Sequence, residues 1–220
     1  MPIDKKELIE ALKKVDEISK KRNFVEAIEL MVNLKDIDLK KPENRINTEL
    51  VLPNEIGGEP NVCVIASGEL AVKAKDLNVR VLDKDELQSL AGNKKAIKKL
   101  AKTYDFFIAS VDLMPLVGKI LGAILGPRGK MPKPVPPNTD LRAVLENYKK
   151  TVRLRMRDNP CIHAKVGTRG MDKEKLAENI NAILSFLEEK LERGPSNIKS
   201  IYLKTTMGPS VKVPYVRSKR

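Results

Sequence analysis

The stretch SIYLKTTMGPSVKVP, residues 200–214, carries the clearest structural pattern in the chain, and the fold can be built outward from it. Apolar and polar side chains alternate on both sides of Gly208-Pro209, which interrupts the alternation. A period of two is typical of a strand with one buried face, and a Gly-Pro pair favours a turn. We therefore predict two short strands joined by a tight turn. The solvent-facing side of this hairpin would carry Ser200, Lys204 and Thr206.

Two hydroxyls and a cation beside a glycine suit contacts with phosphates and ribose 2′-hydroxyls. The glycine, Gly208, would leave room for a second backbone to approach. These residues make the hairpin a candidate RNA-binding edge, and an ordinary solvated hairpin is the alternative.

The charge of the whole chain favours the same class of partner. Lys and Arg number 42 against 29 Asp and Glu in 220 residues, so the formal net charge is +13. Such an excess favours a polyanion, nucleic acid before an anionic membrane. The sequence has no run of eighteen apolar residues and its N-terminus leads into a charged amphipathic segment, so we expect no membrane association, no signal peptide and a cytoplasmic protein.

The two ends of the chain share one style of pattern. Asp4 can cap a first helix, and residues 26–34 then alternate with a period of two, which predicts a strand with one exposed face. Residues 46–52 and 152–156 predict further strands, and Asp172 can cap a second long helix. The apolar residues of the first helix recur at helical spacing: Leu8, Leu12, Val15 and Ile18.

The middle of the chain has a different style, in which short apolar runs alternate with helical patterns. The runs at 61–66, 79–82 and 104–109 predict strands, and the segments between and after them predict helices. This alternation favours a small parallel sheet between helices. The proline-rich segment 131–137 cannot be helical and predicts a stiff surface loop.

We therefore predict two domains of α+β and α/β class. Residues 1–56 and 155–220 would form a split α+β domain with a mainly antiparallel sheet that binds RNA. Residues 57–154 would form an inserted α/β domain with a Rossmann-like parallel sheet. An insertion through two adjacent linkers permits hinge motion.

The glycine-rich segment Gly126–Lys130 invites comparison with a phosphate-binding loop, but its spacing differs. A P-loop needs a glycine where this chain has Ile124 and a Ser or Thr where it has Met131, so this is no ATPase motif. Residues 126–155 nevertheless hold eight basic and two acidic residues. A secondary contact with RNA backbone through Arg128, Lys130 and Lys133 is therefore a hypothesis, and a basic turn that serves solubility is the alternative.

No combination of residues predicts catalysis, a metal site or a cofactor. The chain has one histidine, His163, without a conspicuous nucleophile beside it. We expect Cys63 and Cys161 to be reduced core thiols and the chain not to be an enzyme. Four Phe, four Tyr and no Trp argue against recognition by stacked bases, so a folded RNA read through backbone and shape fits better.

Three blocks resemble motifs of the universal L-one family of large-subunit ribosomal proteins: KTTMGPSV at 204–211, GAILGPRGKMP at 122–132 and IHAKVG at 162–167. The resemblance implies the split domain, the insertion and the mobile hinge. It also implies binding to large-subunit rRNA at the mobile stalk, involvement in release of deacylated tRNA from the exit site, and repression of translation from its own mRNA. It implies a monomer away from the ribosome. The segment 35–44 is short, as in the archaeal branch.

The resemblance also implies the residues of the RNA site. Thr206 would hydrogen-bond ribose or phosphate, Met207 would pack against a ribose or base, and Gly208 would give clearance. Two acidic residues, Glu26 and Glu29, would accept hydrogen bonds from 2′-hydroxyls or base amino groups. The full set is Phe24, Glu26, Glu29, Lys165, Gly167, Thr168, Ser200, Lys204, Thr206, Met207 and Gly208.

Two other functions remain open from the residues alone. A nucleotide-binding α/β enzyme would bind its ligand at the ends of the middle strands, although the sequence lacks a dinucleotide glycine pattern. A nonspecific polyanion binder would hold any duplex RNA as firmly as its rRNA target.

Overall fold

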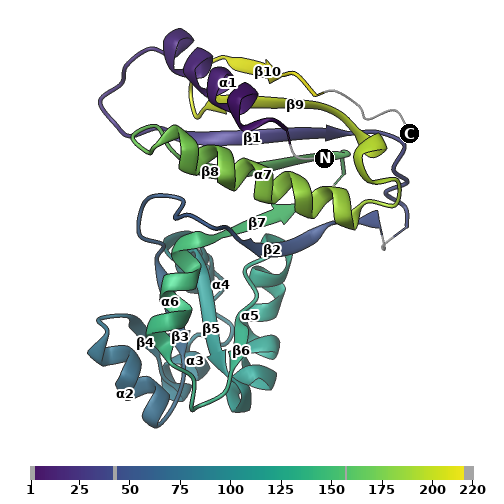
Figure 1. Ribbon diagram of the computed structural model, residues 1–220. Helices are drawn as coiled ribbons and strands as arrows, with labels where there is room; N and C mark the ends of the chain where they lie inside the picture. Colours follow the sequence, from purple (N-terminus) through teal and green to yellow (C-terminus); the bar gives the residue numbers. More distant parts are fainter. Residues whose placement is uncertain (1–2, 42–43, 157, 216–220) are drawn as a thin grey trace. The chain divides into compact units, whose positions relative to one another are not determined.

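The computed structural model describes residues 3–41, 44–156 and 158–215 (Figure 1). The chain forms two compact units: unit 1 comprises Met1–Gly57 with Lys150–Arg220, and unit 2 comprises Gly58–Lys149. Pro42 and Glu43, in the middle of the expected polar loop, lie outside the described residues.

Unit 1 is built on an antiparallel sheet with the strand order β10-β9-β1-β8. Its strands are β1 (Ala27–Leu34), β8 (Cys161–Thr168), β9 (Ile198–Thr205) and β10 (Ser210–Val213). The expected C-terminal hairpin is confirmed, because β9 and β10 pair antiparallel with Val211 opposite Leu203. A separate ribbon pairs β2 (Asn47–Val51) with β7 (Thr151–Arg155).

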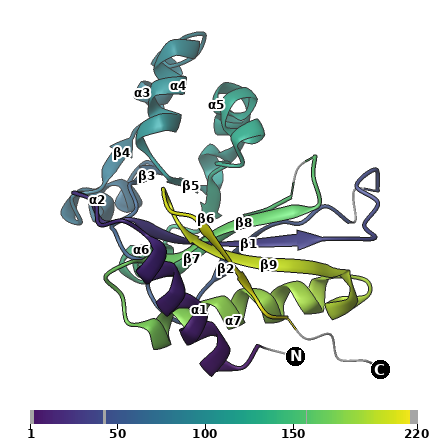
Figure 2. The same cartoon turned by 90° about the horizontal axis from the view of Figure 1, so that it is seen from above.

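Two helices, α1 (Lys5–Ile18) and α7 (Lys173–Lys190), cover one face of the four-stranded sheet. Figure 2 shows both helices on the same side of β1, β8 and β9. Alternate residues of β1 are buried against them, as the period of two predicted. Asp4 caps α1 by accepting from the Lys6 backbone N–H. Ile18 departs from the expected stripe, because it lies in the last turn of α1 with 47% of its surface exposed.

Unit 2 contains a parallel sheet with the order β4-β3-β5-β6. The strands are β3 (Val62–Ile65), β4 (Arg80–Leu82), β5 (Phe106–Ser110) and β6 (Lys133–Val135). The helices of unit 2 are α2 (Glu69–Asp76), α3 (Lys84–Ser89), α4 (Lys94–Thr103), α5 (Met114–Arg128) and α6 (Leu141–Lys150). A 3-10 turn, η2 (Val111–Leu113), precedes α5, and a second one, η3 (Gly194–Asn197), belongs to unit 1.

Both faces of the unit 2 sheet are buried. Cys63, Ile65 and Phe107 pack into one core with α3, α4 and α5, while Val64 and Ile108 pack into another with α2 and α6. This sandwich explains why β3 is an uninterrupted apolar run. The predicted fold class, α+β together with α/β, is confirmed.

Three details differ from the expectations. The proline-rich segment contains β6, which pairs with β5 at the edge of the sheet, where a proline without N–H is tolerated. Residues 126–128 are the last turn of α5, which ends at Gly129 in a left-handed conformation with φ 69°. The expected boundary between residues 154 and 155 falls inside β7, a strand that belongs to unit 1 because it pairs with β2.

Candidate nucleic-acid interface

The outer face of the unit 1 sheet brings several candidate residues together in rows. β1 lies between β8 and β9, so Glu29 faces Lys165 on one side and Lys204 on the other. The next row along the same face places Met31 between His163 and Tyr202. This face is opposite to the one that α1 and α7 cover, since its residues alternate with the buried ones.

A third row extends the polar character of this face. Asn33 lies opposite Ser200, and its amide donates to the Ser200 hydroxyl over 3.1 Å. In the first row, the Lys165 ammonium donates to the Gly57 carbonyl over 2.8 Å, at the point where the chain leaves unit 1. Met31, Asn33 and Tyr202 were not among the predicted site residues, although they lie two or four positions from Glu29 or Lys204 and so on the same face of their strands.

The turn between β9 and β10 lies against the start of β1. The Thr206 hydroxyl accepts from the Ala27 N–H over 3.1 Å, and the Thr206 N–H donates to the Ala27 carbonyl over 3.0 Å. Large apolar side chains lie exposed around this junction: Phe24 is 54% exposed, Val25 73% and Met207 60%. Clustered exposed apolar side chains are typical of an interaction surface rather than of ordinary protein surface.

Glu26 is not part of the exposed face, contrary to the expectation that it accepts from RNA. Only 1% of its surface is exposed. Its carboxylate accepts from Nη1 of Arg169 over 3.3 Å and from the Met207 N–H over 3.2 Å, and the Arg22 guanidinium lies 3.4 Å away. Glu26 therefore holds the β9–β10 turn in place from beneath, while Glu29 stays on the outer face.

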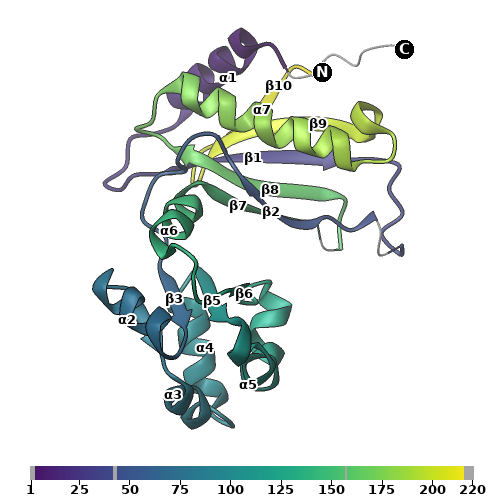
Figure 3. The same ribbon diagram turned by 60° about the horizontal axis from the view of Figure 1, so that its bottom comes forward.

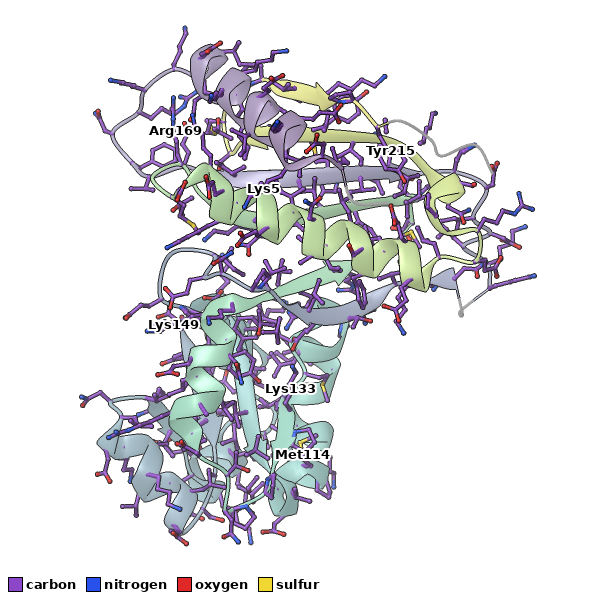
Figure 4. All side chains as sticks on the ribbon, in the orientation of Figure 1. Lys5, Met114, Lys133, Lys149, Arg169 and Tyr215 are labelled. Atoms are coloured by element: carbon purple, nitrogen blue, oxygen red, sulfur yellow. The ribbon has the colours of Figure 1, made fainter. Side chains whose placement is uncertain are left out.

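Arg169 joins this buried carboxylate to the end of α1. Its guanidinium donates to the backbone carbonyls of Asp16, Ser19 and Lys20, each over 3.0 Å, which satisfies acceptors that the helix end leaves free. Figure 4 labels Arg169 in unit 1. We name Glu26, Arg169 and Arg22 the clamp. Arg22 and Glu26 lie outside α1, where a spacing of four has no helical meaning, so no local sequence pattern indicated the clamp.

Packing inside the protein gives a reason for two glycines that are expected to contact RNA. A Cβ on Gly208 would overlap the hydroxyls of Thr205 and Ser19, which lie 3.2 Å from each other. Gly167 is buried, and a Cβ there would overlap the side chain of Leu176. Its neighbour Thr168 is partly exposed at the end of β8.

The three cations proposed as a secondary contact lie in unit 2 and differ from one another. The Lys130 ammonium donates to the carbonyls of Ala101 and Tyr104 over 3.1 and 2.7 Å, so it is held at the end of α4. Lys133 lies over the ring of Tyr148, 5.5 Å from its centroid. Arg128 is exposed in the last turn of α5.

The described residues hold no group of three or more His, Cys, Asp or Glu side chains that could bind a metal ion. Within the same ranges, no helix is both long and apolar enough to cross a bilayer. Burial raises the pKa of the Cys63 thiol to about 12. Cys161 is partly exposed rather than part of the core, and its Sγ lies 3.4 Å from Nε2 of His163.

Comparison with known proteins gives one consistent result. Residues 12–209 match the model of the ribosomal protein L1p/L10e family. A large ribosomal subunit protein uL1 from Thermococcus kodakarensis is 51% identical over 214 residues, which cover 97% of this chain and 99% of the relative. The protein of the same name from Methanothermobacter thermautotrophicus is 50% identical over 94% of this chain and 98% of the relative. The one from Methanocaldococcus jannaschii is 46% identical over 99% of this chain and 100% of the relative.

Proposed function

The chain belongs to the ribosomal protein L1p/L10e family, and from this membership we propose that it binds folded large-subunit rRNA through the outer face of unit 1. It is a structural protein of the large ribosomal subunit and not an enzyme. The proposed surface comprises the row Lys165, Glu29 and Lys204 together with the β9–β10 turn.

One observation carries this proposal: exposed Phe24 and Met207 lie at the same end of the sheet as the Thr206 hydroxyl, beside the row Lys165, Glu29 and Lys204. The clamp supports this arrangement from beneath, because Glu26 bonds to the backbone of the turn. A site held by a rigid, hydrogen-bonded layer loses little conformational entropy on binding.

The chemistry of the surface fits a folded RNA read mainly by shape. Lys204 is suited to phosphate, and Thr206 to phosphate or a ribose 2′-hydroxyl. Met207 and Phe24 are suited to pack against an exposed ribose or base. Glu29 would accept from a 2′-hydroxyl or a base amino group, because a carboxylate cannot pair with phosphate.

A salt titration with two RNAs tests this function. A large-subunit rRNA stalk fragment and a random duplex of equal length are compared, with Thr206→Ala and Met207→Ala as variants. Each substitution should weaken binding to the rRNA fragment roughly tenfold, about 1.4 kcal/mol, and leave the salt slope nearly unchanged. Met131→Ala is the matched control, because Met131 is 41% exposed but lies in unit 2.

A nonspecific polyanion binder gives a different result in that titration. Equal competition by the random duplex would show that the protein binds RNA without recognising the rRNA fragment.

We also propose that the target is the mobile stalk, that the protein contacts exit-site tRNA, and that it assists release of deacylated tRNA there. Family membership supports this, together with a chain that passes twice between the two units, at Gly57–Gly58 and at Lys149–Lys150. Ribosomes that lack the protein should release deacylated tRNA from the exit site more slowly, and an unchanged rate would contradict this role.

We further propose that the protein is a cytoplasmic monomer away from the ribosome and represses its own mRNA. A surface that reads shape would also accept an mRNA segment that folds like the rRNA site. In a translation extract, added protein should reduce synthesis from its own mRNA, and Met207→Ala should relieve that repression. Sedimentation of the free protein tests the monomer.

The two units are proposed as separate domains, with the RNA-binding function confined to unit 1. If the isolated segment 58–149 bound the rRNA fragment as firmly as the whole chain, that assignment would be wrong.

A further inference from the structure

The helix α4 in unit 2 has an exposed face made of lysines. Asn93 caps the helix by accepting from the Ala96 N–H, and Ile97 and Ala101 bury the opposite face in the core. Figure 3 shows α4 beside α3. The exposed positions include pairs three and four residues apart and so share a side of the helix. They are Lys94, Lys95, Lys98, Lys99 and Lys102.

The stability of the helix explains only Lys102, which lies in the last turn, where the helix dipole favours a cation. Lysines four apart repel, and α4 contains three such pairs without an acidic residue in between. Lys94 and Lys95 also lie in the first turn, where the helix dipole disfavours cations. Among residues 3–41, 44–156 and 158–215, no ion pair joins a carboxylate to any of the five. By contrast, Lys73 pairs with Glu69 at 2.8 Å in the same unit.

A pocket of about 480 Å³ adjoins this lysine face. Its apolar lining comes from Leu82, Leu90 and Leu100, and its polar lining includes Arg80 and Lys99. The Arg80 guanidinium is fixed by the Glu86 carboxylate, with both oxygens 3.1 Å from Nη2. An apolar floor beside Lys99 and the Arg80–Glu86 ion pair suits an unstacked base whose phosphates lie outside the pocket.

We propose that the lysine face of α4 is a second RNA-binding surface, which holds the phosphate backbone of a single strand while one base enters the adjoining pocket. Lysine ammonium groups act as point charges on phosphates, so binding here is independent of sequence. The surface uses no residue of unit 1 and does not depend on the rRNA site proposed above.

The test uses the full chain and a fluorescent oligouridylate of about 12 nucleotides. The triple variant Lys94→Gln, Lys98→Gln, Lys102→Gln keeps good helix formers and removes three charges. We expect the slope of log K against log salt to become shallower by about 2, at about 0.7 for each phosphate that a lysine no longer neutralises. The single variant Lys98→Glu should lower the affinity roughly fivefold or more at about 50 mM salt.

The matched control is Lys73→Gln, Lys75→Gln, Lys84→Gln, which changes the net charge of unit 2 equally but on α2 and α3. It should leave the slope unchanged. A slope that is unaltered in the α4 variant, or that becomes equally shallow in both variants, would overturn the proposal. Matching far-UV circular dichroism of the two variants shows that both are folded.

Two further comparisons separate this surface from the other parts of the protein. An abasic strand of equal length should bind the wild type roughly tenfold more weakly, and equal binding would refute the entry of a base into the pocket. The variant Thr206→Ala, Met207→Ala should bind the oligouridylate as the wild type does. Failure of that variant to bind would assign the strand to unit 1 and contradict the proposal.

Discussion

Gly208 offers the sharpest test of how the candidate interface is built, because two explanations of this glycine predict different results. One is clearance for RNA, and the other is packing against Thr205 and Ser19 inside unit 1. A Cβ at position 208 would overlap both hydroxyls. The backbone at Gly208 is not in the left-handed region, so Gly208→Ala changes the packing alone.

The expected magnitude follows from the same packing. Forcing a methyl group into a packed site costs about 1–3 kcal/mol of unfolding free energy. Thr205 is fully buried, so Thr205→Ala should cost about 1 kcal/mol because it removes the 3.2 Å bond with Ser19. Removing the Thr205 hydroxyl relieves one of the two overlaps, and the overlap with the Ser19 hydroxyl remains. The double variant should therefore be less stable than Thr205→Ala alone, but less destabilised than the sum of the two single changes.

Urea unfolding followed by far-UV circular dichroism measures these free energies, and binding of the rRNA fragment is measured on the same samples. Gly170→Ala is the matched control, because nothing lies within 4 Å of a Cβ at that loop position in unit 1. It should change the unfolding free energy by less than about 0.5 kcal/mol. If Gly208→Ala is as stable as the wild type and loses only RNA affinity, the packing explanation is wrong.

The remaining predictions concern buried groups. Glu26→Ala should lower the free energy of unfolding, measured in urea, by about 3 kcal/mol, because it removes the buried carboxylate that pairs with Arg169. Glu29→Ala should lower it by less than about 1 kcal/mol. Similar costs for both variants would contradict the clamp. Lys130→Met should lower the free energy of unfolding by about 1–2 kcal/mol, because it removes the hydrogen bonds from Lys130 to the Ala101 and Tyr104 carbonyls. It should leave the affinity for rRNA unchanged. A weaker affinity would show that Lys130 contacts RNA. The raised pKa of Cys63 keeps its thiol neutral in the fold, whereas the thiol of the unfolded chain ionises at lower pH. The contribution of the neutral Cys63 thiol to the free energy of unfolding should therefore be present below about pH 9 and disappear as pH rises toward 12. A thiol reagent at pH 8 should modify Cys161 in the native protein and Cys63 only on unfolding.

Much of the local structure was predictable because burial of one face leaves a periodic trace along the chain. The alternation in β1 and β9 and the cap at Asp4 each depend on neighbours within a few residues, and each was predicted correctly. The proline-rich segment was harder, because proline excludes helix but leaves loop and edge strand equally open. Only the partner strand β5 distinguishes the two.

The candidate site was predicted less completely, because its polar residues depend on partners that are remote in sequence. Glu26 and Glu29 are three positions apart and chemically similar, yet one is buried under the β9–β10 turn and the other faces outward. The bond from the Met207 N–H to Glu26 spans 181 residues. No local pattern along the chain indicates such a bond.

The fold class, a polyanionic partner and the family could all be predicted from the residues, because periodicity, net charge and short motifs are properties of the chain in one dimension. Which charged residues and glycines support the β9–β10 turn, and which lie on the outer face of the sheet, depends on the tertiary structure. The physical reason is that a carboxylate becomes a clamp only when donors from Arg169 and Met207 meet it away from water, and that meeting is fixed by the three-dimensional packing of α1, β1, β8 and β9.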